Sequence, residues 1–211
     1  VTAHSEPKVE DGKLSVEYTI SQAGTASSSN PEAGDDGTIL GTPAKNEIFY
    51  TSTNGKVVEP YKTEAFGGAI VSNTYANGVG VIVFDREITV SGKFYNRDNL
   101  KSISLPNSIT EIGSSSFALC SNLTRITIPD SVTYIGKWAF YGCGSLTSVV
   151  IGDSVTSIGN YAFYKCDSLE KLTLPCSCEK IGNYTFANSS IVITDSFHGT
   201  VFSILFHGRI L

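Results

Sequence analysis

The cysteines of this chain recur at a spacing that could support redox or metal chemistry. Cys120, Cys143 and Cys166 lie 23 residues apart, and Cys176 and Cys178 form a C-x-C pair. Thiolates bind zinc, and two adjacent thiols can form a disulfide. However, a C-x-C pair without a second pair or a nearby histidine is a weak metal signal. Equivalent cysteines on stacked coils would also have parallel Cβ vectors, which fit a disulfide poorly. We therefore expect buried thiols that act as small hydrophobes, with Cys178 buried and Cys176 exposed, and no metal or other cofactor.

Few other residues could do chemistry. The chain contains three histidines: His4, His198 and His207. Two Phe-His-Gly triplets in the C-terminal tail suggest a metal-binding pair, but two histidines without a third ligand do not make a zinc site. Asp130 and Asp153 share one repeat position and suggest either a calcium site or turns in which the side chain bonds its own backbone. No motif of a hydrolase, a phosphate-binding loop or a zinc protease occurs. We expect a protein that is not an enzyme.

The cysteine spacing is part of a longer repeat. Four nearly identical segments of 23 residues begin at Leu100, Leu123, Leu146 and Leu169. Each follows the pattern L-x-x-I-x-(I/L)-P-(D/N)-S-(V/I)-T-x-I-G-x-x-A-F-x-x-C-x-x, with a few departures. A fixed period of about 20–29 residues headed by leucine is typical of a leucine-rich-repeat solenoid. The sequence therefore predicts a β-rich α/β solenoid built of stacked coils.

The elements of one coil follow from the repeat pattern. Alternating β-branched residues at the start predict a half-buried strand, and the proline that follows ends it. A second short apolar segment closes at a glycine in each repeat, where we expect a bend with φ above zero. The segment around Ala139-Phe140 predicts a single helical or 3₁₀ turn that places a phenylalanine in the core. Stacking should form one column of phenylalanines and one of isoleucines: Phe117, Phe140, Phe163, Phe186 and Ile112, Ile135, Ile158, Ile181.

The I-P-D-S-V-T-x-I-G and A-F-x-x-C elements resemble the BspA-type (treponemal-type) leucine-rich repeats of bacterial surface proteins. The stretch 46–89 is similar to the leader that precedes such repeats in gut Bacteroides-like proteins. The resemblance covers roughly residues 46–190. It implies a secreted or surface-anchored binding protein without catalytic activity, and some members of the family adhere to host matrix proteins.

Composition excludes some partners. The net charge is −5 and the pI is about 5.2, whereas proteins that bind nucleic acid carry basic surfaces. No run of 18 apolar residues occurs, so we expect no membrane insertion of this segment. The chain begins with Val1 and contains no methionine, from which we expect a processed or trimmed product. We expect a monomer that is located outside the cell or on its surface. The surface location includes the case of a protein anchored at an outer membrane.

The remainder of the chain divides by composition. Hairpins are predicted over 47–60 around Asn54-Gly55 and over 69–84 around Asn77-Gly78, because Asn-Gly suits a type I′ turn. A degenerate repeat should follow over 81–99. We expect five regions: a short β segment over 1–22, which could be the remnant of a preceding domain; a flexible linker over 23–45; a hairpin cap and the degenerate repeat over 46–99; four repeats over 100–190; and a C-terminal cap over 191–211.

Binding surfaces should lie on the exterior of the coils. The outward positions of the strands form a Ser/Thr-rich strip with two cations, which we assign as the candidate ligand-binding residues: Ser102, Ser104, Arg125, Thr127, Ser148, Val150, Lys171 and Thr173. Aromatic residues near the turns offer a second candidate contact patch: Tyr134, Trp138, Tyr141, Tyr161, Tyr164 and Tyr184. The first hypothesis is a module that binds host or neighbouring-cell protein. The alternatives are a glycan-binding module of a surface saccharide system and a structural spacer.

Overall fold

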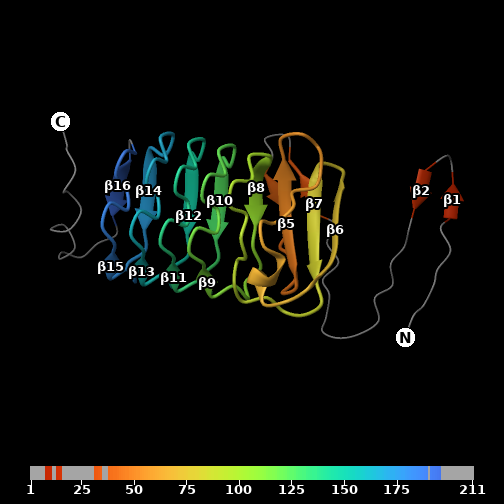
Figure 1. Ribbon diagram of the computed structural model, residues 1–211, viewed down its shortest axis with the longest axis horizontal. Coiled ribbons are helices and arrows are strands. Elements are labelled where there is room, and N and C mark those ends of the chain that lie inside the picture. Colours follow the sequence, from red (N-terminus) through yellow and green to blue (C-terminus); the bar gives the residue numbers. More distant parts are fainter. Residues whose placement is uncertain (1–7, 11–12, 16–30, 35–37, 190, 196–211) are drawn as a thin grey trace.

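The computed structural model describes residues 8–10, 13–15, 31–34, 38–189 and 191–195. Its main body is a β-solenoid in which successive coils lie side by side along one axis (Figure 1). The predicted solenoid is confirmed, but its α/β character is not. The described residues contain a single helix, the 3₁₀ turn η1 (Thr63–Phe66), which lies outside the four repeats. No helix in the described part of the chain has the length and apolar character needed to cross a membrane.

One row of parallel strands comes from the start of each repeat. Its strands are β8 (Leu100–Ser104), β10 (Arg125–Ile128), β12 (Ser148–Ile151) and β14 (Lys171–Leu174), and β14 pairs with β16 (Val192–Asp195). Ile126 pairs with Ile103 on one side and with Val149 on the other. All three side chains are buried. The 23-residue period therefore places equivalent residues in register, because every coil has the same length.

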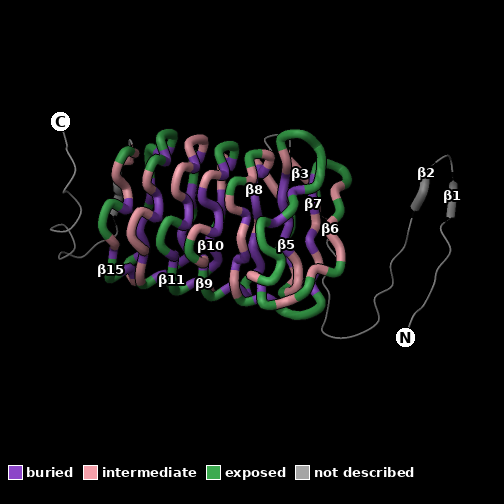
Figure 2. Tube along the Cα trace, viewed as in Figure 1, coloured by how far each residue is buried: buried purple, intermediate pink, exposed green. Residues whose placement is uncertain are grey.

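A second row of short parallel strands comes from the middle of each repeat: β9 (Glu111–Ile112), β11 (Tyr134–Ile135), β13 (Ser157–Ile158) and β15 (Lys180–Ile181). The isoleucine of each strand pairs with the isoleucine of the next and is buried. The predicted isoleucine column is confirmed. Figure 2 shows buried segments recurring at the same place in successive coils.

The glycine that follows each isoleucine has a different role from the one we expected. Gly136 and Gly159 are not among the glycines with positive φ, so the expectation of a left-handed bend is wrong. Instead, each glycine touches the backbone of the preceding coil. A Cβ atom would lie 2.6 Å from the amide nitrogen of Ser114 if added at Gly136, and 2.6 Å from that of Lys137 if added at Gly159. Close packing between coils therefore requires glycine here.

The predicted helical turns are not confirmed. The segment that carries the buried phenylalanine places two residues in the left-handed region, as at Trp138 (φ 59°) and Gly142 (φ 69°). A right-handed helix cannot include such residues. The backbone amides bond the next coil instead: Trp138 N donates to Asn160 O (3.0 Å), and Phe140 N donates to Ala162 O (2.8 Å). These segments thus form a third hydrogen-bonded row between coils.

The phenylalanine column is confirmed and forms the centre of the core. Successive rings from Phe94 to Phe186 stack with centroids 5.0–5.7 Å apart and planes within 5–14° of each other. The cysteines form a second column beside it. The thiols of Cys120, Cys143 and Cys166 each donate to a phenylalanine carbonyl of the preceding coil, as from Cys143 Sγ to Phe117 O (3.0 Å). Cys120, Cys143, Cys166 and Cys178 are buried and Cys176 is exposed, as expected, and the five cysteines form no disulfide.

The column of buried cysteines predicts that the thiols of the chain differ in reactivity. Burial raises the pKa of Cys120 and Cys166 to about 12 and raises that of Cys143 well above its usual range. The reactive species is the thiolate, so these thiols should stay inert in the folded protein. With a thiol-specific chromogenic reagent at pH 8, we expect one rapid equivalent, from Cys176. In denaturant without reductant we expect all five cysteines of the chain to react, and a smaller number would reveal a disulfide.

The N-terminal end of the solenoid is antiparallel. β5 (Glu47–Ser52) pairs with β8 and with β7 (Val79–Phe84), and β7 pairs with β6 (Ile70–Ala76). The hairpin predicted over 69–84 is therefore present, with Asn77 and Gly78 both at positive φ. The hairpin predicted over 47–60 is wrong, because β5 pairs on its two edges with the distant strands β7 and β8.

Residues 88–96 form the second half of an additional coil. Val90 bridges Glu111 in parallel, Phe94 N donates to Ser116 O (2.6 Å), and the Phe94 ring stacks on Phe117. The degenerate repeat thus contributes to the phenylalanine column, while the antiparallel strand β5 lies where the first half of that coil would be. The capping role and the division into five regions remain predictions.

Two short ladders lie before β5. β1 (Lys8–Glu10) pairs with β2 (Lys13–Ser15), and β3 (Glu32–Ala33) pairs with β4 (Ile39–Leu40). The second ladder falls within the segment that we expect to be a linker. The tail histidines and the C-terminal cap beyond residue 195 lie outside the described residues.

Candidate functional site

The structure brings the predicted ligand-binding residues to one face of the first strand row. Arg125 pairs with Ser102 and with Ser148, and Thr127 pairs with Ser104 and with Val150. On the next strand, β14, Lys171 and Thr173 occupy the equivalent repeat positions. Their neighbours in each strand point into the core and are buried. Because the strand alternates with period two, the eight residues share the outer face.

Part of this outer face is covered by the chain itself. Ser102 is only 3% exposed, and its Oγ lies 2.6 Å from Thr51 Oγ1 of β5. β4 packs against β5 and β8, and Arg125 Nη1 donates to Thr38 Oγ1 (2.7 Å). The segment 38–40 thus lies against the N-terminal part of the strand face. No sign of this contact appears in the sequence, because Ile39 and Leu40 are too short an apolar run to indicate a strand.

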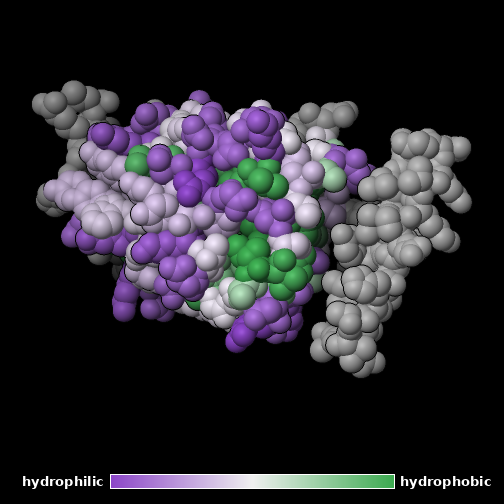
Figure 3. Space-filling model, turned by 45° about the vertical axis from the view of Figure 1, so that its right-hand side comes forward, coloured by the Kyte–Doolittle hydropathy of each residue, from purple (hydrophilic) through white to green (hydrophobic). Residues whose placement is uncertain are grey.

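The open part of the strand face consists of five exposed residues, Thr127, Ser148, Val150, Lys171 and Thr173, which we call the open strand face. Val150 is 56% exposed although it is strongly apolar, and polar side chains flank it. Figure 3 shows one side of the molecule, where small hydrophobic patches lie within a largely hydrophilic surface. The open strand face bears one cation and no carboxylate.

The aromatic residues near the turns form a second exposed surface. Tyr134, Trp138 and Tyr184 are 36%, 40% and 53% exposed. Trp138, Tyr161 and Tyr184 occupy the same position of three consecutive repeats, and their rings follow one another across the coils. The sequence predicted these aromatics near the turns but not their alignment, which depends on the backbone conformation at this position.

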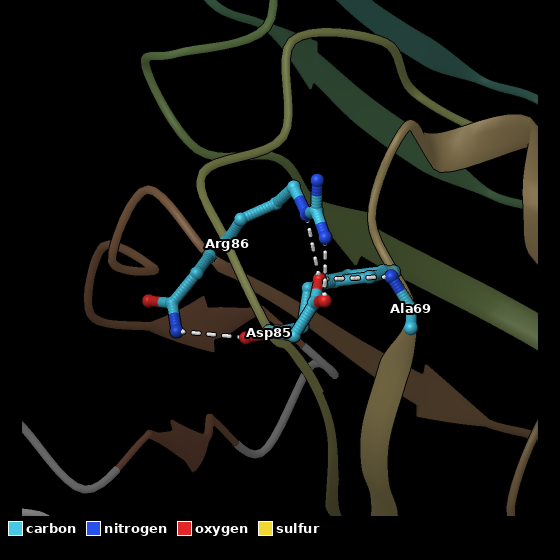
Figure 4. Close-up of polar contacts among 5 residues, drawn as sticks. Ala69, Asp85 and Arg86 are labelled. Atoms are coloured by element: carbon cyan, nitrogen blue, oxygen red, sulfur yellow. Dashed lines mark hydrogen bonds and ion pairs between the residues drawn. The ribbon is translucent and has the colours of Figure 1, made fainter.

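A shallow hollow of ≈ 620 Å³ lies beside the β6–β7 hairpin and is lined by Thr63, Glu64, Gly67, Gly68, Ala69, Ile70 and Arg86. Both Nε and Nη2 of Arg86 donate to the carboxylate of Asp85 (3.0 and 2.9 Å), and Ala69 N also donates to it (2.9 Å) (Figure 4). The hydrogen bonds from Arg86 lower the pKa of Asp85. The pair ties the start of β6 to the end of β7 and neutralises Arg86, so Glu64 is the remaining charged group in the lining of the hollow.

Acidic residues at the turns are also accounted for by structure. Asp130 Oδ1 accepts a hydrogen bond from Asp153 N of the next coil (3.1 Å), so this carboxylate bonds the backbone of a neighbouring coil. Within the described ranges, no three His, Cys, Asp or Glu side chains gather as a metal site would require.

Comparisons with known proteins agree with this architecture. Residues 88–204 match the family model described as BspA type leucine rich repeat region, in 6 copies. Solved structures that resemble the chain include leucine-rich repeat proteins from Bacteroides capillosus, Bacteroides ovatus and Treponema pallidum, with 35%, 32% and 25% identity and TM-scores of 0.40, 0.49 and 0.38. The matches cover 44%, 59% and 44% of this chain, and 66%, 31% and 57% of those chains. Each match therefore spans less than two thirds of the related chain. No curated protein matches the sequence.

Proposed function

Because the chain belongs to the family of BspA-type leucine-rich repeat proteins, we propose that it is a non-catalytic module that binds a protein ligand through its open strand face. The observation that carries the proposal is the placement of Val150, an exposed apolar side chain among polar residues on β12, which pairs with β10 and contacts β14. Solenoids present extended, regular surfaces to their ligands. Protein interfaces commonly combine an apolar centre with a polar rim.

The chemistry of the open strand face suits a protein ligand. Thr127, Ser148 and Thr173 carry hydroxyl groups that both donate and accept hydrogen bonds, and each loses little side-chain freedom on binding. Lys171 adds one positive charge, which favours a ligand with acidic groups. In the covered part of the face, Ser102 and Arg125 would contribute only if the segment 38–40 moved away.

The proposal also covers the location of the protein, its oligomeric state and its class of ligand. We propose a secreted or cell-surface protein, anchored at an outer membrane or released, that acts as a monomer in adhesion to host matrix proteins. The family and the acidic net charge of −5 support extracellular protein binding over nucleic-acid binding.

The strand-face proposal predicts the effect of a single charge. We expect the purified chain to bind at least one member of a panel of immobilised laminin, fibronectin and type I collagen in biolayer interferometry. Val150→Glu should weaken that binding at least tenfold, because it places a carboxylate at the apolar centre of the contact.

The matched control is Thr133→Glu, which adds the same charge at an exposed position between the two strand rows and should leave the affinity unchanged. Equal losses in both variants would show that binding depends on net charge and not on the open strand face. Absence of binding to all three matrix proteins would contradict the matrix-adhesion proposal and would favour the spacer alternative.

A further inference from the structure

Three aromatic side chains occupy a backbone position that does not favour them. Trp138, Tyr161 and Tyr184 lie in the left-handed region, with φ of 59°, 59° and 57°. The backbone is held there by hydrogen bonds between coils, from Trp138 N to Asn160 O and from Tyr161 N to Asn183 O (both 3.0 Å). Stacking of the coils therefore imposes this conformation on whichever residue occupies the position. We call the three residues the aromatic column.

Core packing does not explain the aromatic column. Left-handed backbone is costly for bulky residues and suits glycine or asparagine, and Trp138 and Tyr184 remain 40% and 53% exposed. A second left-handed position lies four residues further along each repeat and shows no such preference. It holds Leu119, Gly142, Lys165 and Asn188. Strain that persists at exposed positions is often associated with function.

The rings form a continuous surface along the solenoid. Trp138 and Tyr161 have centroids 6.3 Å apart, and Tyr161 and Tyr184 lie 5.1 Å apart with planes inclined by 16°. These separations are typical of offset or tilted ring pairs, and the two outer rings of the row, Trp138 and Tyr184, remain exposed. A shorter stack runs alongside, with Tyr141 and Tyr164 at 5.6 Å, and Tyr161 meets Tyr164 edge to face.

Polar groups around the rings are side-chain amides, phenols and an ammonium group. Asn160 is partly exposed and Asn183 is exposed, and Asn188 Nδ2 donates to the Tyr164 hydroxyl (2.9 Å). Lys137 Nζ lies 4.0 Å from the centroid of the Trp138 ring. The backbone amides of Trp138 and Tyr161 are already bonded between coils, so a peptide could not add to this surface as a further strand.

We propose that the aromatic column binds an extended glycan that runs along the solenoid axis. The C–H faces of pyranose rings stack on exposed aromatic faces, and their hydroxyls bond amides and phenols. One ring is presented per coil, with centroids 5.1–6.3 Å apart, a step similar to the length of one sugar unit in an extended chain. This site is separate from the open strand face and uses a different ligand class.

The test is a printed array of host and microbial glycans probed with the fluorescently labelled chain, followed by affinity electrophoresis in any soluble polysaccharide that carries the hit. We expect Tyr184→Gly to weaken glycan binding at least tenfold without lowering the melting temperature, because glycine relieves the left-handed strain. Tyr134→Ala removes an exposed aromatic outside the aromatic column and should bind as the wild type does.

Four results would overturn the proposal. The wild type could bind no glycan on the array, the binding could survive Tyr184→Gly, or Tyr184→Gly could destabilise the fold as much as it weakens binding. Binding of a proline-rich peptide at the aromatic column in place of any glycan would also overturn it. Because Val150→Glu should leave glycan binding intact, failure of this proposal is distinguishable from failure of the strand-face proposal.

Discussion

Phe140→Ala is expected to lower the free energy of unfolding by about 3–5 kcal/mol. Phe140 is fully buried, and its ring stacks between Phe117 (centroids 5.3 Å apart) and Phe163 (5.0 Å). Truncation removes the ring from the middle of the phenylalanine column and leaves a cavity that neighbouring coils cannot fill, because intercoil hydrogen bonds on both sides fix their backbones.

Urea unfolding followed by circular dichroism measures this effect. Phe140→Leu retains most of the volume and should cost less than about half as much. The surface control Tyr134→Ala removes an aromatic ring that is 36% exposed and should cost much less than Phe140→Ala. A nearly neutral result for Phe140→Ala would show that the phenylalanine column is not the core of the solenoid.

Gly159→Ala should destabilise the fold by about 1–3 kcal/mol through overpacking. A Cβ atom at this position would lie 2.6 Å from Lys137 N and 2.8 Å from Gly136 C. Both contacts are with backbone of the preceding coil, so no side-chain rotation can relieve them. The coils would have to separate, which would weaken the hydrogen bond from Gly159 N to Ile135 O (2.8 Å).

The chain supplies a matched control at the same repeat position. A Cβ atom at Gly113 would meet only side chains, with Ser116 Oγ nearest at 3.1 Å and Val90 Cγ1 of the preceding coil at 3.8 Å. Gly113→Ala should therefore cost clearly less than Gly159→Ala when both are measured by urea unfolding. Neither glycine has positive φ, so equal losses would contradict the close-packing explanation.

The repeat period accounts for what could be predicted. Identical spacing places equivalent residues in register whatever the detailed coil shape, so the isoleucine and phenylalanine columns and the burial of the cysteines followed from the sequence. The reason why a glycine follows each of these isoleucines could not be predicted, because close approach between coils and a positive φ both favour glycine. We expected helical turns from the short apolar segments. Instead, the backbone amides of Phe140 and its equivalents donate hydrogen bonds to carbonyls of the next coil.

The N-terminal third shows a second limit of sequence patterns. The Asn77-Gly78 turn joins adjacent strands and was found. In contrast, β5 pairs with the distant strands β7 and β8, and no local pattern encodes such a pairing. The burial of Ser102 could not be predicted for the same reason. Alternation placed it on the outer face, but its burial comes from Thr51 and the nearby β4, which the sequence does not link to it.

The central claim is that a protein ligand binds on the open strand face. Mapping the residues that contact this ligand tests the claim most directly. The amide chemical shifts of isotopically labelled protein would be followed while each of the three matrix proteins, as soluble fragments, is added. We expect the largest changes at Thr127, Val150 and Thr173 and little change at Glu111 and Lys180 in the second strand row. Changes confined to the second row, or no changes with any of the three, would contradict the claim.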